Sequence, residues 1–252
     1  MSRCCIALGG NTGDPELSFA EALTQIEHYG VQVLQTSSSI LTPAMGSSAG
    51  SDFLNAAAIL DTNLDASDVL QLLHHIEAGF GRKRSVHWGP RVIDLDLLFF
   101  EQQILDTDEI VIPHPCLWYR RFVLEPLNQI APDWIHPTLN ESVAKLHSRL
   151  NDRPLHLEIV STDRISVEAL QSIAETVWGR GQLKFSLAED NTTASQNTFA
   201  RLVEEPSSVR AQPKLEHSRV IRVPRNCPDG KQNDTTALWT ELLKDFGTAA
   251  LS

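Results

Sequence analysis

Two aspartates, Asp94 and Asp96, stand one residue apart inside the apolar run 92–100. Alternate side chains of a β-strand point to the same face, so both carboxylates would share one face and Leu95 and Leu97 the opposite one. Neighbouring carboxylates repel each other, and a divalent cation relieves that repulsion. Mg²⁺ suits such a pair, because it binds one or two carboxylates and completes its shell with phosphates and water. The spacing predicts a magnesium site; the alternative is a solvated strand face with two unrelated aspartates.

Basic side chains precede the two aspartates closely. The segment contains Arg82, Lys83, Arg84, His87 and Arg91. Its Arg and Lys side chains contribute a local charge of +4 in a chain whose formal net charge is −11. A polyphosphate needs such cations beside a metal site, because guanidinium groups hold the phosphate oxygens that the metal does not. We therefore expect a polyphosphate to bind here; an exposed basic loop is the alternative.

An aromatic ring and an amide, Phe53 and Asn55, would also share one strand face. The ring offers a flat stacking surface and the amide offers donors and acceptors at its edge, which suits a planar heterocycle. The alternative is a core phenylalanine beside a turn asparagine. Further along, two prolines flank His114 and hold the chain extended, ahead of Arg120 and Phe122. That segment either positions His114 and Arg120 on a ligand or is a rigid turn.

The elements that must hold these residues alternate between strands and helices. One helix is predicted from Pro15, with Asp14 as its N-cap and Gly30 after its end. A second is predicted after an N-cap at Asp65 or Ser67. Strands are predicted at 3–8, 31–34, 53–60 and 92–100, and a short helix at 122–130. This order, with the later strands antiparallel, predicts an α+β fold: a two-layer plait with helices packed on an antiparallel sheet.

The chemistry is confined to the first part of the chain, so we divide it into a domain, 1–152, and an extension, 153–252. Periodicity in the extension predicts a small α/β unit, with strands at 156–160, 183–187 and 220–223 and helices at 167–177 and 238–246. A flexible polar stretch, 189–212, is predicted to be either a long loop or disordered. The role of the extension stays open between a degenerate second α/β domain, an oligomerisation element and a partner-binding tail.

Composition narrows the class of protein. The 252 residues are 42% hydrophobic, enough to bury a core. The net charge of −11 argues against a nucleic-acid binder, which needs excess Lys and Arg. The cysteines Cys4, Cys5, Cys116 and Cys227 form no CxxC pair, so we expect free thiols in a reducing compartment. Neither a basic-then-apolar leader nor a long apolar run is present, and we expect a cytoplasmic protein that does not bind membranes.

Several short stretches form an ordered set between residue 3 and about residue 150. They are Ala7–Asn11, Thr42–Pro43 with Gly46, Asp52–Ala56, Ile76–Glu77, Gly81–Arg82, Trp88–Asp96, Pro113–Pro115, Arg120–Leu124 and Ile130–Pro132. In their order and spacing these stretches resemble the 6-hydroxymethyl-7,8-dihydropterin pyrophosphokinase family. The specificity lies in the ordered set rather than in any one stretch. The extension after residue 153 has no counterpart in this resemblance.

The resemblance implies a ferredoxin-like α+β fold and transfer of pyrophosphate from ATP to 6-hydroxymethyl-7,8-dihydropterin, with AMP released. It implies two Mg²⁺ ions on Asp94 and Asp96, with Arg82 and Arg91 as further catalytic residues. For the pterin it implies Thr42, Pro43, Met45, Gly46, Phe53, Asn55, Trp88 and Phe122. For ATP it implies Glu77, Arg82, Arg84, Arg91, His114 and Arg120. Departures from the family pattern at His74, Glu109 and Val111 concern the nucleotide side.

Two other functions are compatible with parts of the pattern. A metal-dependent nuclease or phosphatase also uses paired carboxylates, and would hydrolyse its substrate without needing an aromatic pair around a heterocycle. A non-catalytic nucleotide-binding or scaffold protein would bind without turnover, with the extension as its working part. Release of AMP that depends on added pterin distinguishes the kinase from both. ATP and the hydroxymethyl dihydropterin are the partners we expect, and protein partners stay unassigned.

Overall fold

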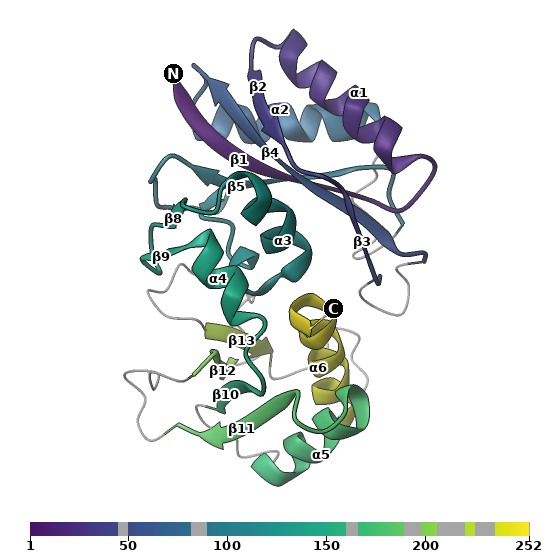
Figure 1. Ribbon diagram of the computed structural model, residues 1–252, viewed down its shortest axis with the longest axis vertical. Helices are drawn as coiled ribbons and strands as arrows, with labels where there is room; N and C mark the ends of the chain where they lie inside the picture. The colour runs from purple at the N-terminus through teal and green to yellow at the C-terminus, as the bar shows by residue number, and fades with distance from the viewer. Residues whose placement is uncertain are drawn as a thin grey trace. The chain divides into compact units, whose positions relative to one another are not determined.

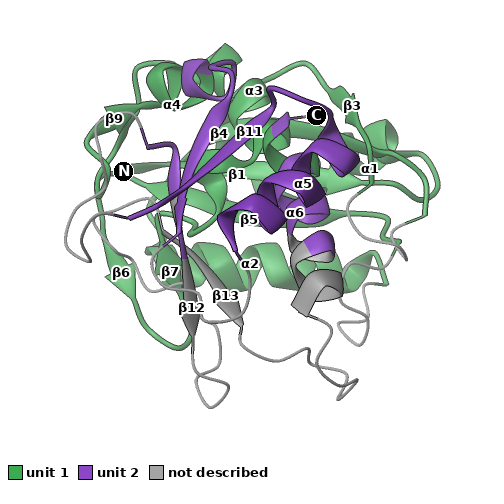
Figure 2. Cartoon of the chain, turned by 90° about the horizontal axis from the view of Figure 1, so that it is seen from below, with its two compact units in different colours: residues 1–147, 248–250, 252 green, residues 148–247, 251 purple. Residues whose placement is uncertain are grey.

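The computed structural model describes residues 1–44, 50–81, 90–159, 166–188, 198–205, 220–224 and 235–251. The chain forms two compact units (Figure 2). The first unit comprises residues 1–147 with 248–250, and the second unit comprises residues 148–247 with 251. No helix among the described residues is both long enough and apolar enough to cross a membrane.

An antiparallel sheet forms the centre of the first unit (Figure 1). Its strands are β1 (Ser2–Gly10), β2 (Gln32–Thr36), β3 (Ile40–Thr42), β4 (Phe53–Thr62) and β5 (Asp94–Phe100). They lie in the order β2–β4–β1–β5, and β3 pairs with β4 further along the same strand. The long strands β1 and β4 therefore form the middle of the sheet.

Two helices, α1 (Pro15–His28) and α2 (Ala66–Gly79), begin where the sequence predicts them. The Asp14 carboxylate accepts a hydrogen bond from the Leu17 amide at 3.1 Å, and Asp65 accepts one from the Asp68 amide at 2.9 Å. These bonds satisfy amides that have no partner within the helix. The predicted N-cap at Asp14 is confirmed, and of the two candidates for α2 the structure selects Asp65.

The two faces of this sheet differ in chemistry. The face toward α1 and α2 is apolar, with Cys4, Ile6 and Leu8 of β1 in one buried cluster with Phe19 of α1 and Leu73 of α2. Burial of these side chains is the main stabilising contribution to the unit. Because side chains alternate along a strand, the residues between them face the opposite side of the sheet.

That opposite face carries α3 (Arg121–Ile130), preceded by the 3-10 turn Leu117–Tyr119 (Figure 1). The α3 residues Val123, Leu124 and Leu127 are buried. The unit is completed by two hairpins, β6 (Leu105–Asp106) with β7 (Val111–Ile112) and β8 (Ile135–His136) with β9 (Glu141–Ser142). Helix α4 (Val143–Arg149) also belongs to it, except for its last two residues, which group with the second unit. This is a mixed helix and sheet unit, as the α+β prediction requires.

The second unit contains a parallel sheet of β10 (Leu155–Ile159), β11 (Leu183–Leu187), β12 (Ala200–Glu205) and β13 (Val220–Pro224), in the order β11–β10–β12–β13. Its helices are α5 (Val167–Trp178) and α6 (Thr235–Leu251). Strand β12 lies inside the stretch 189–212 that the sequence predicts to be a loop or disordered, so 200–205 differ from that prediction. Ala200 and Leu202 are buried, but Arg201 separates them and two glutamates follow Val203, so the few apolar residues of this polar stretch form no clear strand pattern.

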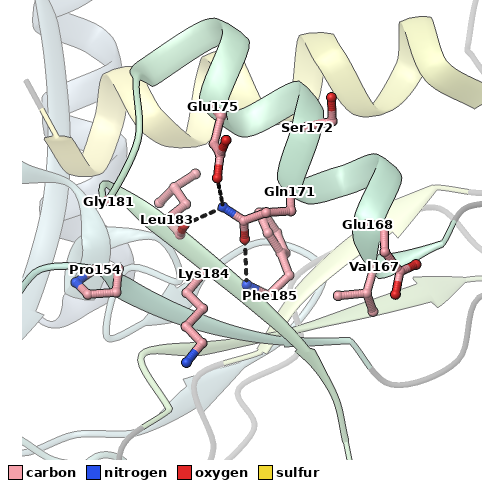
Figure 3. Close-up of a pocket in the computed structure, with 10 residues that line it drawn as sticks. All are labelled: Pro154, Val167, Glu168, Gln171, Ser172, Glu175, Gly181, Leu183, Lys184 and Phe185. Carbon is pink, nitrogen blue, oxygen red and sulfur yellow. Dashed lines mark hydrogen bonds between the residues drawn. The ribbon is translucent and has the colours of Figure 1, made fainter.

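Strand β11 ends the second unit's sheet, and a side chain of α5 covers its outer edge (Figure 3). The Gln171 side-chain amide donates from Nε2 to the Leu183 carbonyl at 3.1 Å and accepts from the Phe185 amide at 3.3 Å. Edge strands expose such groups to solvent and to other chains. Gln171 thus takes the place that a neighbouring strand's peptide would occupy.

Candidate functional site

The predicted site residues on strands lie on the sheet face opposite α1 and α2. Gly9 of β1 pairs with Asn55 of β4 on one side and with Asp94 of β5 on the other. One step along, Ala7 pairs with Asp96. A Cβ built on Gly9 would lie 3.5 Å from Asn55 Oδ1 and 3.8 Å from Asp94 Cβ. The sheet therefore places the Asn55 amide and the carboxylates of Asp94 and Asp96 around Ala7 and Gly9 of β1. Because Ala7 and Gly9 are small, a ligand can approach the backbone of the sheet here, and we call this surface the floor.

On the β4 side, hydrogen bonds orient the Asn55 amide. Asn55 is 6% exposed, and its Nδ2 donates to Thr42 Oγ1 at 2.9 Å and to the Phe53 carbonyl at 3.2 Å. Since both donors point at the protein, the amide oxygen faces the floor beside Gly9 and can accept a hydrogen bond there. Thr42 and Asn55, which the resemblance assigns to the pterin, are thus in contact in the structure, and Phe53 lies on the same strand face as Asn55.

The segment that carries Thr42 is held in place by α3. Gln129 Oε1 accepts hydrogen bonds from the Ser38 amide at 3.0 Å and from the Ser38 hydroxyl at 2.7 Å. Ser38 lies just before β3, whose Thr42 pairs with Phe53 of β4. Neither Gln129 nor Ser38 could be identified from the sequence, because no local pattern links two polar residues so far apart in the chain.

Arg91 connects the two sides of the floor. Its Nη1 lies 2.7 Å from Asp94 Oδ2, and both side chains are largely buried, at 18% and 23% exposed. The guanidinium carbon also lies 5.7 Å from the centre of the Phe53 ring. A cation over an aromatic face is attracted by the ring's negative potential. The structure thus brings together Arg91, Asp94 and Phe53, which the sequence assigned to phosphate, metal and heterocycle.

The His114 loop packs against β5 beside Asp96. The His114 amide donates to the Leu98 carbonyl at 2.9 Å, and His114 Nε2 lies 4.0 Å from Asp96 Oδ2. Burial lowers the pKa of His114 to about 4, against the opposing effect of Asp96, and Arg120 lowers it further. His114 Nδ1 accepts from the Cys116 amide at 3.3 Å, so at neutral pH the ring proton is on Nε2 and directed toward Asp96.

Arg120 and Phe122 lie where the 3-10 turn passes into α3. The Arg120 guanidinium carbon lies 5.6 Å from the centre of the Phe122 ring. Arg120 Nε is buried without a hydrogen-bond partner among the described residues. A buried, unpaired guanidinium nitrogen is costly, which is a reason to expect an anionic ligand at this position.

Glu77 reaches the site from the α2 side. It is 1% exposed, and its Oε1 accepts a hydrogen bond from the Leu95 amide at 2.8 Å. Leu95 lies between the two aspartates, so Glu77 fixes the backbone that carries them. The sequence assigned Glu77 to the nucleotide site. In the structure its described contact is with the strand that carries Asp94 and Asp96.

Five of the predicted site residues lie outside the described residues, namely Met45, Gly46, Arg82, Arg84 and Trp88. Pro43 is described and directly follows β3. Among the described residues no group of three or more His, Cys, Asp and Glu side chains is placed to hold a metal. A pair of carboxylates on one strand face fits Mg²⁺, which takes few protein ligands and completes its shell with phosphate and water oxygens.

The pocket in Figure 3 belongs to the second unit and contains none of the predicted site residues. It is an open depression of about 630 Å³ along α5 and β11. Its central polar side chain, Gln171, already bonds to Glu175 Oε1 and to the backbone of β11. We therefore place the candidate chemistry on the sheet of the first unit.

Comparison with known proteins finds its matches in the same part of the chain. Residues 5–132 match the family model described as 7,8-dihydro-6-hydroxymethylpterin-pyrophosphokinase (HPPK). A 2-amino-4-hydroxy-6-hydroxymethyldihydropteridine pyrophosphokinase of Methylorubrum extorquens is 40% identical over 152 residues, covering 58% of this chain and 94% of that protein. One of Bacillus subtilis is 40% identical over 126 residues, covering 50% and 75%. The folic acid synthesis protein FOL1 of Dictyostelium discoideum is 36% identical over 148 residues, covering 58% and 22%.

Proposed function

The chain belongs to the 7,8-dihydro-6-hydroxymethylpterin-pyrophosphokinase family, and we propose that the floor formed by β1, β4 and β5 is its active site. The protein is an ATP-dependent transferase of folate biosynthesis. It moves pyrophosphate from ATP to 6-hydroxymethyl-7,8-dihydropterin, giving AMP and the pterin diphosphate. The sheet order β2–β4–β1–β5, with α1 and α2 on one face, supports the ferredoxin-like plait that the resemblance implies.

The β4 side of the floor binds the pterin in this proposal. The Asn55 oxygen faces the floor, and a pterin carries N–H donors along its pyrimidine edge, so the two are complementary. Phe53 and Phe122 would stack on the ring faces. Thr42 would act through Asn55, whose amide it orients. The remaining pterin residues are those implied by the resemblance, namely Pro43, Met45, Gly46 and Trp88.

The β5 side binds the phosphates and the metal. Asp94 and Asp96 would hold Mg²⁺, for which we retain two ions. Bound Mg²⁺ supplies charge neutralisation at the phosphate oxygens of ATP. Arg91 contacts Asp94 at 2.7 Å, so a cation on Asp94 would free its guanidinium for the transferred phosphates. Arg82, Arg84, Arg120 and Glu77 complete the nucleotide side, with Glu77 holding the backbone between the two aspartates.

The reaction needs alignment more than covalent help from the protein. The acceptor is a primary alcohol, a weak nucleophile, and phosphoryl transfer is accelerated mainly by positioning and by stabilising charge. Arg91 would stabilise negative charge on the group in transfer, since it lies between the heterocycle side and the carboxylate side. Neutral His114 would donate a hydrogen bond from Nε2 to a phosphate oxygen without adding charge.

One observation carries the residue assignments. Asn55, Gly9 and Asp94 form a row across three strands on one face, and Arg91 contacts both Asp94 and Phe53. A nuclease or phosphatase has no use for the oriented amide and the ring beside it. We also place the enzyme in the cytoplasm, supported by the free thiols of Cys4, Cys5 and Cys116 among the described residues.

The test is AMP release from the full chain with ATP, Mg²⁺ and 6-hydroxymethyl-7,8-dihydropterin, with each component omitted in turn. We expect AMP only when all three are present. AMP or phosphate released without pterin would instead support the hydrolase, and binding of ATP without AMP would support the scaffold. Phe53→Ala should raise the KM for pterin. Leu34→Ala, which truncates an exposed apolar side chain of β2, is the control.

A further inference from the structure

Asn11, the residue that follows β1, connects two segments that are distant in sequence. Its Nδ2 donates to the Ser51 carbonyl at 2.9 Å, and its carbonyl accepts from the Ser51 hydroxyl at 2.8 Å. Its Oδ1 accepts from the Arg91 amide at 2.9 Å, and its own amide donates to the Arg91 carbonyl at 3.0 Å. Each of its four polar groups thus bonds to one of two residues, and each partner is held through two bonds.

The neighbouring glycines show how closely these segments approach. A Cβ on Gly10 would lie 2.5 Å from the Val92 carbonyl oxygen, a contact that no side chain tolerates. Gly50 has a positive φ of 80°, and a Cβ there would lie 3.4 Å from Pro90 Cγ and 3.7 Å from Asn11 Nδ2. The end of β1, residues 50–52 and residues 90–92 are therefore packed backbone to backbone, with Asn11 between them.

The two partners of Asn11 lead into the two halves of the proposed active site. Ser51 lies two residues before Phe53, at the start of the strand that carries the pterin side. Arg91 lies three residues before Asp94, and its side chain holds Asp94 and covers Phe53. A change in the backbone of either segment is therefore transmitted to the other through one residue, by the side chain and the backbone of Asn11.

We propose that Asn11 is a positioning residue that couples binding of the pterin to binding of the nucleotide. This inference rests on the proposed active site, and it adds a residue that touches neither substrate. Pterin bound to Phe53 and Asn55 would hold residues 50–55 in one conformation. Through its hydrogen bonds, Asn11 would then hold the backbone of Arg91, whose side chain binds the phosphates in the proposed site. By reciprocity, nucleotide binding would strengthen pterin binding by the same factor.

The test measures that coupling directly on the full chain. Transfer of the β,γ unit breaks the bridge between the α- and β-phosphates, so α,β-methylene-ATP binds without reacting. The coupling ratio is the pterin Kd without this analogue divided by the pterin Kd with it, both in Mg²⁺. We expect a wild-type ratio of at least about 10, and a fall toward 1 in Asn11→Ala. Asn63→Ala, in the exposed turn after β4, is the matched control and should keep the wild-type ratio.

A second variant separates the two side-chain hydrogen bonds of Asn11, one to Ser51 and one to Arg91. Asn11→Asp keeps an acceptor for the Arg91 amide but replaces the donor to the Ser51 carbonyl by an oxygen. It should retain nucleotide affinity and lose coupling, with a larger rise in pterin KM than fall in kcat. Ser51→Ala removes a single bond to Asn11 and should lower the ratio by a smaller factor.

The outcomes distinguish this proposal from the one on which it rests. If wild type makes no AMP with pterin, the proposed function fails. If wild type makes AMP but has a coupling ratio of 1, or if Asn11→Ala and Asn11→Asp weaken both ligands equally and keep the ratio, Asn11 has only a structural role and the inference is overturned. Thermal melts of each variant show whether a loss reflects unfolding.

Discussion

The two units use buried polar side chains in different ways. In the first unit the nearly buried Asn55 turns its donors inward to Thr42 and its oxygen toward the open floor. In the second unit the equally buried Glu158 of β10 accepts a hydrogen bond from Thr198, whose carbonyl in turn accepts from Arg149 at 3.3 Å. A buried polar residue thus indicates a ligand site when part of its hydrogen-bonding capacity faces a surface, and a structural pair when its bonds run within the fold.

The sheets differ in a related way. The antiparallel sheet of the first unit has one apolar face under α1 and α2 and one face with the proposed site residues. In the second unit, the residues Leu155, Leu157 and Ile159 of strand β10 in the parallel sheet are buried. Leu170 of helix α5 and Leu243 of helix α6 are buried in the same unit. We therefore expect the first unit to carry the chemistry and the described residues of the second unit to contribute to folding alone, and substitutions in each unit test this difference.

The largest expected effect is on chemistry in the first unit. Asp96→Asn removes a carboxylate charge from the proposed metal pair, and we expect kcat/KM for AMP formation to fall at least about 10³-fold, or roughly 4 kcal/mol of transition-state stabilisation. Steady-state kinetics in Mg²⁺ measure this, with Asp106→Asn on the exposed strand β6 as the control. Normal turnover by Asp96→Asn would remove the metal assignment.

Matched core substitutions separate the two units next. Leu73 of α2 and Leu170 of α5 are both 0% exposed, so truncation of each to Ala should cost its own unit about 3 kcal/mol of unfolding free energy. Hydrogen exchange resolved by segment reports which unit opens. Leu170→Ala should leave the rate of AMP formation within about twofold of wild type at a temperature where both units are folded. A large loss of activity in Leu170→Ala would give the second unit a part in catalysis.

A pH effect on stability should follow from His136 in the first unit. The side chain is 3% exposed, and burial lowers its pKa to about 4. The unfolded chain takes up a proton below about pH 6.5 while the folded histidine stays neutral to about pH 4, so stability present above pH 6.5 is lost as the pH falls through this window. His114, also with a pKa lowered to about 4 by burial, adds an effect of the same sign.

His136→Asn keeps an acceptor near Nδ1 for the Leu139 amide and cannot titrate. The loss of unfolding free energy between pH 7 and pH 5 should therefore be about 2 kcal/mol smaller in this variant than in wild type. Urea unfolding at the two pH values measures the difference, with the exposed His28→Asn as the control. An unchanged pH dependence in His136→Asn would show that this residue is not the source.

The smallest effect concerns the sheet edge of the second unit. Gln171→Ala removes the side-chain amide that bonds to the backbone at Leu183 and Phe185 (Figure 3), and should lower the second unit's stability by about 1 kcal/mol without changing AMP formation. Segment-resolved hydrogen exchange should show faster exchange at the Phe185 amide. Ser172→Ala, at the next and exposed position of α5, is the control, and equal effects from both would contradict the edge-cover role.

Local patterns in the sequence predicted much of the fold and the core of the candidate site. That Asp94 and Asp96 share a face could be predicted because the alternation of side chains depends only on the strand itself. The N-cap at Asp14 could be predicted because its hydrogen bond is to Leu17, three residues along the chain. Strand β11 lies at 183–187 as predicted. Interactions between distant segments could not be predicted this way. The placement of Gly9 between Asn55 and Asp94 depends on strand register, and the contacts of Asn11 depend on three segments meeting.

Strand β3 and a bulge in β5 could not be predicted from the sequence, for physical reasons. Strand β3 has three residues, too few for a periodic signal. Cys5 and Ile6 of β1 pair with Phe99 and Leu97 of β5. Leu98 is therefore an extra residue in β5, and the bulge that it forms places Phe99 on the same face as Asp96. Such a bulge leaves no mark in the alternation of an apolar run. Phe99 stacks on Trp134 at 5.8 Å between ring centres, so this shift helps to anchor the hairpin that carries His136.

The order of the two units along the chain has a consequence for biosynthesis. Every element that carries a proposed site residue, from β1 to α3, lies before residue 131. A ribosome adds about 5–20 residues per second, so residues 148–247 take about 5–20 s to synthesise after residues 1–147 have been made. Sheets of this size fold in less time than that. Residues 1–147, which carry the proposed site, can therefore fold while the chain is still attached to the ribosome, before the second unit is complete.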